Sequence, residues 1–253
     1  MNPELIKASL NLHAVLQNLE DLVVYDTAVA DLARDWNVAI QFSVFRGPAA
    51  YIEFQNGTCK VGRGAHAAPD VRLFFTSAAH LNRMMDGKGN PIPLKGFTRL
   101  GFLMKEFPKA TDRLEYYLKP TDELLADKQY LELNTRMTLN TAAFALRELA
   151  RMDPIGRLNA AHMPDGTVLM KILPDGPAAH VQFSSGDIQV FKGDVERPTA
   201  MLLFKDFQIA NRFLNGKMDV FTAVAAGDVM IKGQTPMLDA LGLILDRVPV
   251  YLS

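Results

Sequence analysis

Apolar residues in the first half of the chain change from helical spacing to strand-like alternation. Leu12, Leu16, Leu19 and Val23 recur at helical intervals, and Asn2-Pro3-Glu4 ahead of them suits a helix start. From residue 38 onward the apolar positions alternate, which is typical of half-buried strands. The pattern predicts strands over residues 38–45, 50–55, 58–62 and 70–75, a helix over 77–86, an extended segment over 92–96, and a helix over 98–118 interrupted near Pro108.

The second half of the chain predicts the same order of elements. A helix near 136–151 places Leu139, Ala143, Leu146 and Leu149 on one face, and residues 120–134 ahead of it are also predicted to be helical. The pattern then predicts strands over 167–173, 179–184, 187–192, 200–204 and 229–233, with helices over 206–215 and from Thr235 onward. An additional strand over 155–163 is expected to pair with 167–173 across a Pro-Asp-Gly turn.

The two halves are also similar residue by residue. A shift of 129 positions places Gly47-Pro48-Ala49-Ala50 on Gly176-Pro177-Ala178-Ala179, and the match continues without a gap to Lys88 and Lys217. Fifteen of these 42 aligned positions are identical, including the turn glycines Gly57 and Gly186. Chance similarity would not keep turns, strands and a helix in register for so long. The sequence therefore predicts two tandem modules, over residues 1–119 and 120–253.

Charge and composition exclude several classes of function. Charged residues make up 22% of the 253 residues and the net charge is −1, without a block of Lys and Arg. This balance argues against general nucleic-acid binding and against electrostatic docking on anionic membranes. The N-terminus does not resemble a signal peptide, and no apolar run is long enough to span a bilayer. We therefore expect a soluble, cytoplasmic protein without stable membrane insertion.

Residues that could support catalysis or metal binding occur without a recognisable pattern. The five histidines have no metal-ligand spacing, and Cys59, the only cysteine, aligns with Ile188 of the second module. No phosphate-binding glycine loop and no Gly-x-Ser-x-Gly turn is present. The sequence thus predicts no metal, no cofactor and no enzymatic activity.

Three short segments in each module point to one known family. In the second module they are Ala200–Phe207, Phe213–Met218 and Val229–Gly233; in the first they are Val71–Thr76, Met84–Lys88 and Pro93–Gly96. Their order and spacing resemble those of the sterol carrier protein type 2 domain. The resemblance implies an α+β fold, in which each module has a roughly five-stranded, mainly antiparallel sheet with helices covering one face. It also implies non-catalytic binding or transfer of a lipid, fatty acyl chain or sterol-like molecule in an apolar tunnel between sheet and helices.

The same resemblance implies which residues would line the tunnel. In the second module these are Phe213, Leu214, Met218, Phe221, Val224, Met230, Met237, Leu241 and Ile244. In the first they are Met84, Met85, Leu94, Phe97, Leu100, Leu103 and Met104. Arg83 and Arg212 are candidate contacts for a polar head group, although a solvated arginine on a short helix needs no ligand.

One difference separates the two modules. Fifteen residues lie between Gly216 and Lys232, whereas seven lie between Gly87 and Lys95. The first module therefore lacks a segment that, in the family, closes one side of the tunnel, and the second is expected to hold the more complete site. Two alternatives stay open: a scaffold that binds a protein partner or helps to handle a hydrophobic metabolite such as a quinone, and an enzyme acting on a lipid or acyl thioester.

Overall fold

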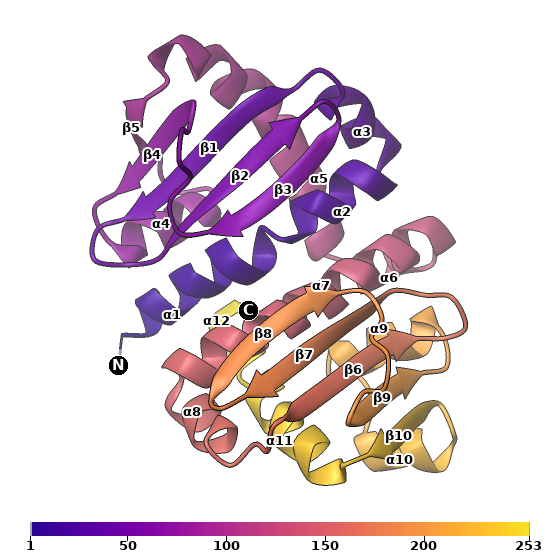
Figure 1. The fold of residues 1–253 in the computed structure, drawn as a ribbon. Coiled ribbons are helices and arrows are strands. Elements are labelled where there is room, and N and C mark those ends of the chain that lie inside the picture. The colour runs from indigo at the N-terminus through magenta and orange to yellow at the C-terminus, as the bar shows by residue number, and fades with distance from the viewer. Residues whose placement is uncertain (1, 253) are drawn as a thin grey trace. The chain divides into compact units, whose positions relative to one another are not determined.

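The protein is described here from a computed structural model covering residues 2–252, in which the chain divides into two compact units. The N-terminal unit comprises Asn2–Lys119 and the C-terminal unit begins at Pro120 (Figure 1). The predicted module limits at Met1 and Ser253 lie outside the described residues. Within residues 2–252, no helix combines the length and the apolar content needed to cross a bilayer.

The N-terminal unit starts with helices and continues as a five-stranded sheet. The helical part consists of α1 (Pro3–Leu10), the π-helical turn η1 (Asn11–Val15), α2 (Asn18–Tyr25) and α3 (Thr27–Ala33). The remaining elements are β1 (Asn37–Val44), β2 (Ala49–Gln55), β3 (Thr58–Arg63), β4 (Val71–Phe75), α4 (Ala78–Met85), β5 (Ile92–Lys95), η2 (Phe97–Arg99), η3 (Phe102–Glu106) and α5 (Phe107–Leu118). The strand order is β3-β2-β1-β4-β5, with β1 and β4 parallel and the other pairs antiparallel.

The C-terminal unit has the same topology. Its elements are α6 (Asp122–Leu125), α7 (Lys128–Met152), α8 (Pro154–Ala160), β6 (Gly166–Ile172), β7 (Ala178–Ser184), β8 (Asp187–Lys192), β9 (Ala200–Phe204), α9 (Phe207–Leu214), α10 (Val220–Ala225), β10 (Val229–Gly233), α11 (Thr235–Leu245) and α12 (Val248–Leu252). The order β10-β9-β6-β7-β8 repeats that of the first sheet, again with one parallel pair, β6 and β9. The predicted α+β class and the two five-stranded sheets are confirmed.

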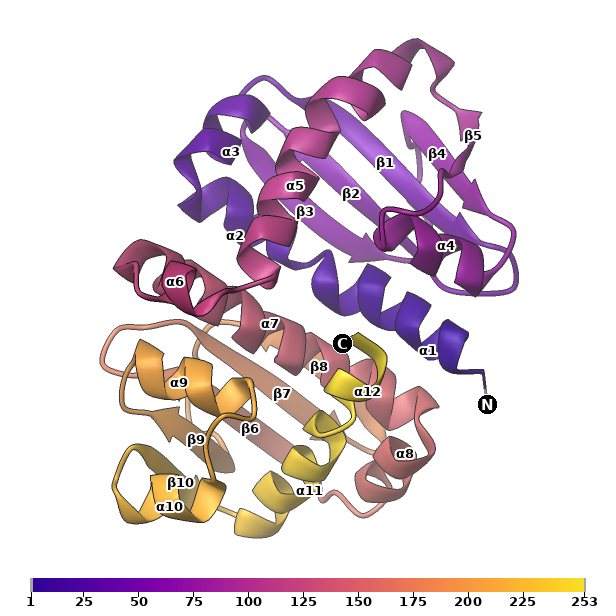
Figure 2. The ribbon, with the colours of Figure 1, turned by 180° about the vertical axis from the view of Figure 1, so that it is seen from behind.

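Each core lies between one face of a sheet and the helices that cover it. Along β2 the burial alternates, so that Ala50, Ile52 and Phe54 are buried while the residues between them are less so. Figure 2 shows α4 and α5 over one face of the first sheet, and α9 and α11 over the corresponding face of the second. Strand alternation with one buried face is the pattern that predicted these elements from the sequence.

The repeat found in the sequence is reproduced in the bounds of the elements. Strands β2, β3 and β4 and helix α4 begin and end 129 residues before β7, β8, β9 and α9. The hairpin turns share positive φ as well, at Asn56-Gly57 and at Ser185-Gly186. Positive φ at both central positions suits a two-residue hairpin between right-twisted strands. Helix α10 has no counterpart among the elements of the N-terminal unit.

The predicted strand over 155–163 is wrong, because most of this segment forms helix α8. Asp153 caps that helix, its carboxylate accepting a hydrogen bond from the Gly156 amide at 2.8 Å, and Pro154 occupies the first helical turn. A capping aspartate followed by proline strongly favours a helix start. The hairpin expected across the Pro-Asp-Gly turn is therefore overruled by this cap.

The Lys-Gly dipeptide that ends β5 and β10 is explained by its backbone. Gly96 and Gly233 have φ values of 90° and 84°. A Cβ atom at Gly233 would lie 2.1 Å from the Thr199 carbonyl oxygen, and one at Gly96 would lie 2.8 Å from that of Asp70. Both positions therefore require glycine for two reasons, the left-handed conformation and the close approach of a neighbouring strand.

Gly233→Ala is expected to lower the free energy of unfolding of the C-terminal unit by about 2 kcal/mol or more, because the left-handed conformation alone costs about 1–2 kcal/mol. Overlap with the Thr199 carbonyl adds to this cost. Gly216→Ala is the matched control, since its φ is 66° but an added Cβ would meet nothing within 4 Å. Urea denaturation followed by circular dichroism measures both, and equal losses would contradict the steric part of this explanation.

Candidate functional site

In the C-terminal unit the predicted wall residues come from four elements around the β9–β10 edge of the sheet. Helices α9 and α11 both contact β9, and α10 contacts β10. From α11, Met237, Leu241 and Ile244 are buried. Phe213, Leu214, Met218 and Met230 are half-buried, and the Phe213 ring lies 5.2 Å from that of Phe204 on β9.

Helix α10 presents the exposed part of this set. Phe221 is 85% exposed, and Val220 and Val224 are exposed as well. Asp219 caps the helix by accepting from the Thr222 amide at 2.8 Å, and glycines with positive φ, Gly216 and Gly227, lie on either side of it. The exposure of these apolar side chains thus increases from α11, where they are buried, to α10, where they face solvent.

In the N-terminal unit the predicted wall residues are mostly exposed. Met84, Met85 and Leu103 are half-buried, whereas Leu94, Phe97, Leu100 and Met104 are exposed. The last strands differ in the same direction: Ile92 on β5, paired with Phe74, is 41% exposed, whereas Met230 on β10, paired with the corresponding Leu203, is half-buried.

An aromatic cluster occupies the interior of the N-terminal unit beside these residues. Trp36 contacts Phe54 and Phe102 edge-to-face, with ring centroids 5.0 Å apart in both pairs, and Phe107 lies 6.3 Å from Phe54. Sequence analysis did not single out this cluster. Its only signal was the single tryptophan placed just before the first strand.

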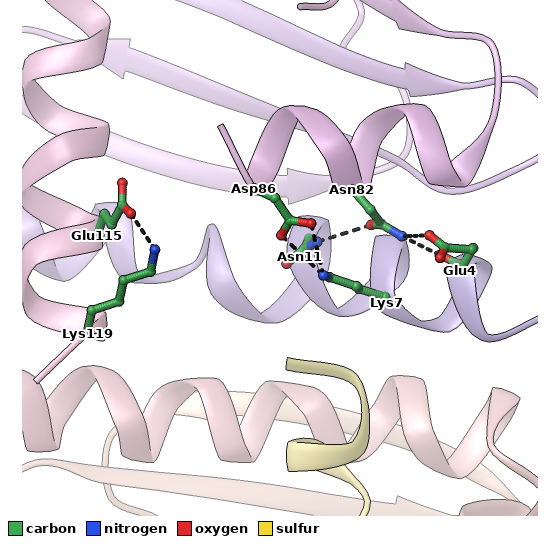
Figure 3. A network of polar contacts seen from close by, with 7 residues as sticks. All are labelled: Glu4, Lys7, Asn11, Asn82, Asp86, Glu115 and Lys119. Carbon is green, nitrogen blue, oxygen red and sulfur yellow. Dashed lines mark hydrogen bonds and ion pairs between the residues drawn. The ribbon is translucent and has the colours of Figure 1, made fainter. Parts of the chain in front are cut away.

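The repeated Asn-Arg pairs divide into a buried and an exposed residue. Asn82 is buried on α4, where it accepts from Asn11 at 3.1 Å and donates to the Glu4 carboxylate at 2.7 Å (Figure 3). Asn211 is its counterpart on α9, donating to Asn134 at 2.6 Å and to Thr135 at 3.0 Å. These bonds join α4 to α1 and η1 in the first unit, and α9 to α7 in the second. Arg83 and Arg212 are exposed.

Figure 3 also shows how the end of α4 is held by charge. Lys7 on α1 forms an ion pair with Asp86, at the C-terminal end of α4, at 3.1 Å. Lys119 pairs with Glu115 along α5 in the same view. Both pairs are at least partly exposed, so each contributes little to stability. Asp86 is the carboxylate nearest to β5 along the chain, and it is already paired with Lys7.

Both units contain an Asp–Arg–Tyr cluster that sequence analysis missed. In the N-terminal unit Asp26 accepts from Arg113 Nε at 3.1 Å and from Tyr117 Oη at 2.9 Å. In the C-terminal unit Asp153 accepts from Arg247 Nε at 3.3 Å and from Tyr251 Oη at 2.6 Å. Each aspartate also caps the helix that it precedes, α3 or α8. The clusters join this capping aspartate to the last helical segment of each unit. The Arg-x-x-x-Tyr pattern that recurs in both of these segments was the signal in the sequence that could have revealed the clusters.

Corresponding members of the two clusters have their pKa shifted in the same direction. Burial alone would raise the pKa of Asp26, but hydrogen bonds from Arg113, the Val29 amide and Tyr117 outweigh it and hold that pKa below 3.8. Burial and the bond to Asp26 raise the pKa of Tyr117 to about 12. The pKa of Asp153 is lowered in the same way: burial opposes the shift, and Tyr251, the Gly156 amide and Arg247 produce it.

Groups that could act as nucleophiles or bases take part in local structure. His13 lies 3.0 Å from the Ala49 carbonyl and His80 lies 2.8 Å from that of Asn90. Cys59 is half-buried on β3. Within residues 2–252 no group of three or more His, Cys, Asp or Glu side chains is arranged to hold a metal ion.

Comparison with known proteins gives matches among solved structures alone. No family model matches the chain, and no curated protein matches it. The chain is similar to a crystal structure of sterol carrier protein 2, with 18% identity, 42% of this chain and 91% of that chain covered, and a TM-score of 0.34. It is also similar to sterol carrier protein 2 from Yarrowia lipolytica (14% identity, 42% and 89% covered, TM-score 0.31). A UbiJ-SCP2 ubiquinone synthesis protein matches at 8% identity (40% and 86% covered, TM-score 0.32).

A stereoselective inverting sec-alkylsulfatase from Pseudomonas sp. also matches, at 14% identity and a TM-score of 0.26. The match covers 57% of this chain but 28% of the sulfatase. The sterol carrier resemblance predicted from the sequence thus recurs among solved structures. Because identities are below 20% and TM-scores are no higher than 0.34, the ligand and activity of this chain are inferred from its own residues.

Proposed function

We propose that this protein binds an apolar ligand, such as a lipid or a fatty acyl chain, in its C-terminal unit and without catalysis. The observation that carries the proposal is the graded apolar set around β9 and β10. Met237, Leu241 and Ile244 supply a buried wall, and Phe221 on α10 leaves 85% of its surface in water. Covering exposed apolar surface contributes roughly 25 cal/mol per Å², so a ligand that lies against α10 is bound by the hydrophobic effect.

The form of α10 supports a role as a movable cover over this site. It is six residues long, lies between Gly216 and Gly227, and is attached to the last strand through contacts with β10. Half-buried methionines, Met218 and Met230, lie on the segments that flank it. Thioether side chains adapt to ligands of different shape because they are flexible and polarizable. This composition favours apolar ligands of varied shape.

The shorter N-terminal unit is proposed to lack an enclosed site of this kind. The corresponding apolar residues on β5, η2 and η3 are mostly exposed, and Phe102 of η3 packs inward on the aromatic cluster around Trp36. The two modules therefore have different roles in this proposal, one binding the ligand and the other presenting an exposed apolar face.

Ligand binding is tested by organic extraction of the purified protein with mass spectrometry, and by titration with a fluorescent fatty acid. The double variant Phe221→Ser, Val224→Ser is expected to bind the fatty acid at least about tenfold more weakly, equivalent to about 1.4 kcal/mol. Both side chains are exposed, so the fold should persist. Ile155→Ser on α8, another exposed apolar position of the same unit, is the matched control. An extract without lipid, together with no thermal shift on adding fatty acids or sterols, would contradict the proposal.

A further inference from the structure

A continuous segment of the N-terminal unit combines exposed apolar side chains with an excess of positive charge. It runs along the chain from the end of α4 through β5 and η2 to η3, and we call it the basic apolar face. Phe97 is 63% exposed, Met104 75% and Leu94 54%. Its apolar residues are Ile92, Leu94, Phe97, Leu100 and Met104, and its cations are Lys88, Lys95, Arg99 and Lys105.

The apolar side chains are held outward by packing on the inner side of the same segment. Phe97, Leu100 and Met104 are spaced by three and four residues, which places them on one side of a helical turn. Between them in the sequence, Phe102 is half-buried and packs edge-to-face on Trp36 at 5.0 Å. The N-terminal unit has no element equivalent to α10.

The charge of this segment is not balanced by carboxylates within it. Residues 88–105 contain four cations and no carboxylate, in a chain whose net charge is −1. Among residues 2–252, Lys88, Arg99 and Lys105 have no ion-pair partner, while Lys95 donates to the Pro69 carbonyl. The nearest acids along the chain are already paired, Asp86 with Lys7 at 3.1 Å and Glu106 with Lys109 at 2.9 Å.

A further cation lies on the neighbouring strand. Arg72 on β4 is exposed and is the register partner of Lys95 on β5. Two like charges opposite each other in a ladder are unfavourable, unless an anion lies near both. The arrangement therefore extends the positive charge from η2 and η3 onto the edge of the sheet.

We propose that the basic apolar face docks on an anionic lipid surface. Apolar side chains of this size lower their free energy by entering the boundary between head groups and acyl chains, while flanking Lys and Arg remain among the phosphates. Each cation near an anionic bilayer contributes about 1 kcal/mol, and the four cations of the segment complement the negative charge of such a surface. The inference goes beyond the proposed ligand site, which lies in the other unit.

Vesicle co-sedimentation of the full chain tests the proposal, with vesicles of phosphatidylcholine alone or mixed with phosphatidylglycerol. Partition onto the anionic vesicles is expected to exceed that onto neutral ones and to fall with added salt. Arg99→Gln, Lys105→Gln should weaken it about thirtyfold, corresponding to about 1 kcal/mol for each cation. Phe97→Ser, Met104→Ser should weaken it at least about tenfold.

Matched controls come from exposed residues elsewhere in the same unit. Arg46→Gln, Lys60→Gln removes two other cations, and Val24→Ser, Phe45→Ser removes two other apolar side chains; each should change partition by no more than about twofold. Energy transfer from Trp36, the only tryptophan, to a dansyl lipid gives a second readout close to the face.

Three results would overturn the proposal: no partition onto either vesicle, equal partition of the face and control variants, or a dimer in light scattering that Phe97→Ser, Met104→Ser dissociates. The last would assign the face to contact between copies of this chain. The outcome is separable from that of the proposed function, because fatty-acid titration of the face variants reports on the C-terminal unit, and Phe221→Ser, Val224→Ser should leave vesicle partition unchanged.

Discussion

Replacing Asp26 with alanine is expected to lower the free energy of unfolding of the N-terminal unit by about 3 kcal/mol. The change removes the cap of α3 and leaves the buried ends of Arg113 and Tyr117 without their acceptor. Loss of one member of a buried ion pair typically costs about 3–5 kcal/mol, and loss of a cap about 1 kcal/mol. We expect the lower end of that range because 37% of the Arg113 side chain is exposed.

Urea denaturation followed by Trp36 fluorescence measures this effect, because the only tryptophan lies in the same unit. Asp26→Asn is the control that keeps an acceptor for the Val29 amide while removing the charge, so its loss should be smaller. Tyr117→Phe should cost about 1 kcal/mol, the usual contribution of one hydrogen bond. If Asp26→Ala costs no more than a cap alone, the cluster does not stabilise the junction between α3 and α5.

Acidification is expected to destabilise both units through the same two clusters. Asp26 and Asp153 have lowered pKa values in the folded state, so the folded protein binds fewer protons than the unfolded chain near pH 3.8. Their contribution is therefore complete above about pH 5 and is lost as the pH falls through 3.8 toward the lower pKa of the folded state. Tyr117 has the opposite sign: with its pKa raised to about 12, its contribution is lost as the pH rises through that value.

Denaturation curves recorded from neutral to acidic pH measure this dependence for each unit. In Asp26→Asn the Trp36 signal should show a flatter dependence of the unfolding free energy on pH, whereas in Asp153→Asn the Trp36 signal should keep its original slope. A slope that neither substitution changes would mean that other carboxylates determine the acid sensitivity.

The strand framework could be predicted from the sequence because its determinants are local. Alternating burial, as along Ala50, Ile52 and Phe54, and glycine turns such as Asn56-Gly57 set strands and connections within a few residues. The segment over 155–163 was mispredicted because the Pro-Asp-Gly turn suggested a hairpin, while the Asp153-Pro154 cap that starts a helix was not considered. The π-helical turn over Asn11–Val15 has no comparable signal in the sequence, since it requires a specific register of backbone hydrogen bonds.

The candidate site was less predictable, because exposure depends on neighbours that are distant along the chain. Met237 and Phe221 were both assigned to one apolar wall, yet the first is buried and the second is 85% exposed. The Asp–Arg–Tyr clusters join residues 87 to 98 positions apart, so no local window contains them. Net charge averaged over the whole chain argued against membrane docking, whereas residues 88–105 contain four cations and no carboxylate.

The location of α10 between two fixed points has a consequence for how such modules can diverge. The Gly-Lys corner after each short helix and the glycine after the last strand hold the ends of this segment, and the Asp–Arg–Tyr cluster anchors the closing helical segment independently. Eight residues can therefore be gained or lost between these anchors while the sheet keeps its strand order. The two modules can therefore present different side chains beside the last strand while the rest of the fold is kept.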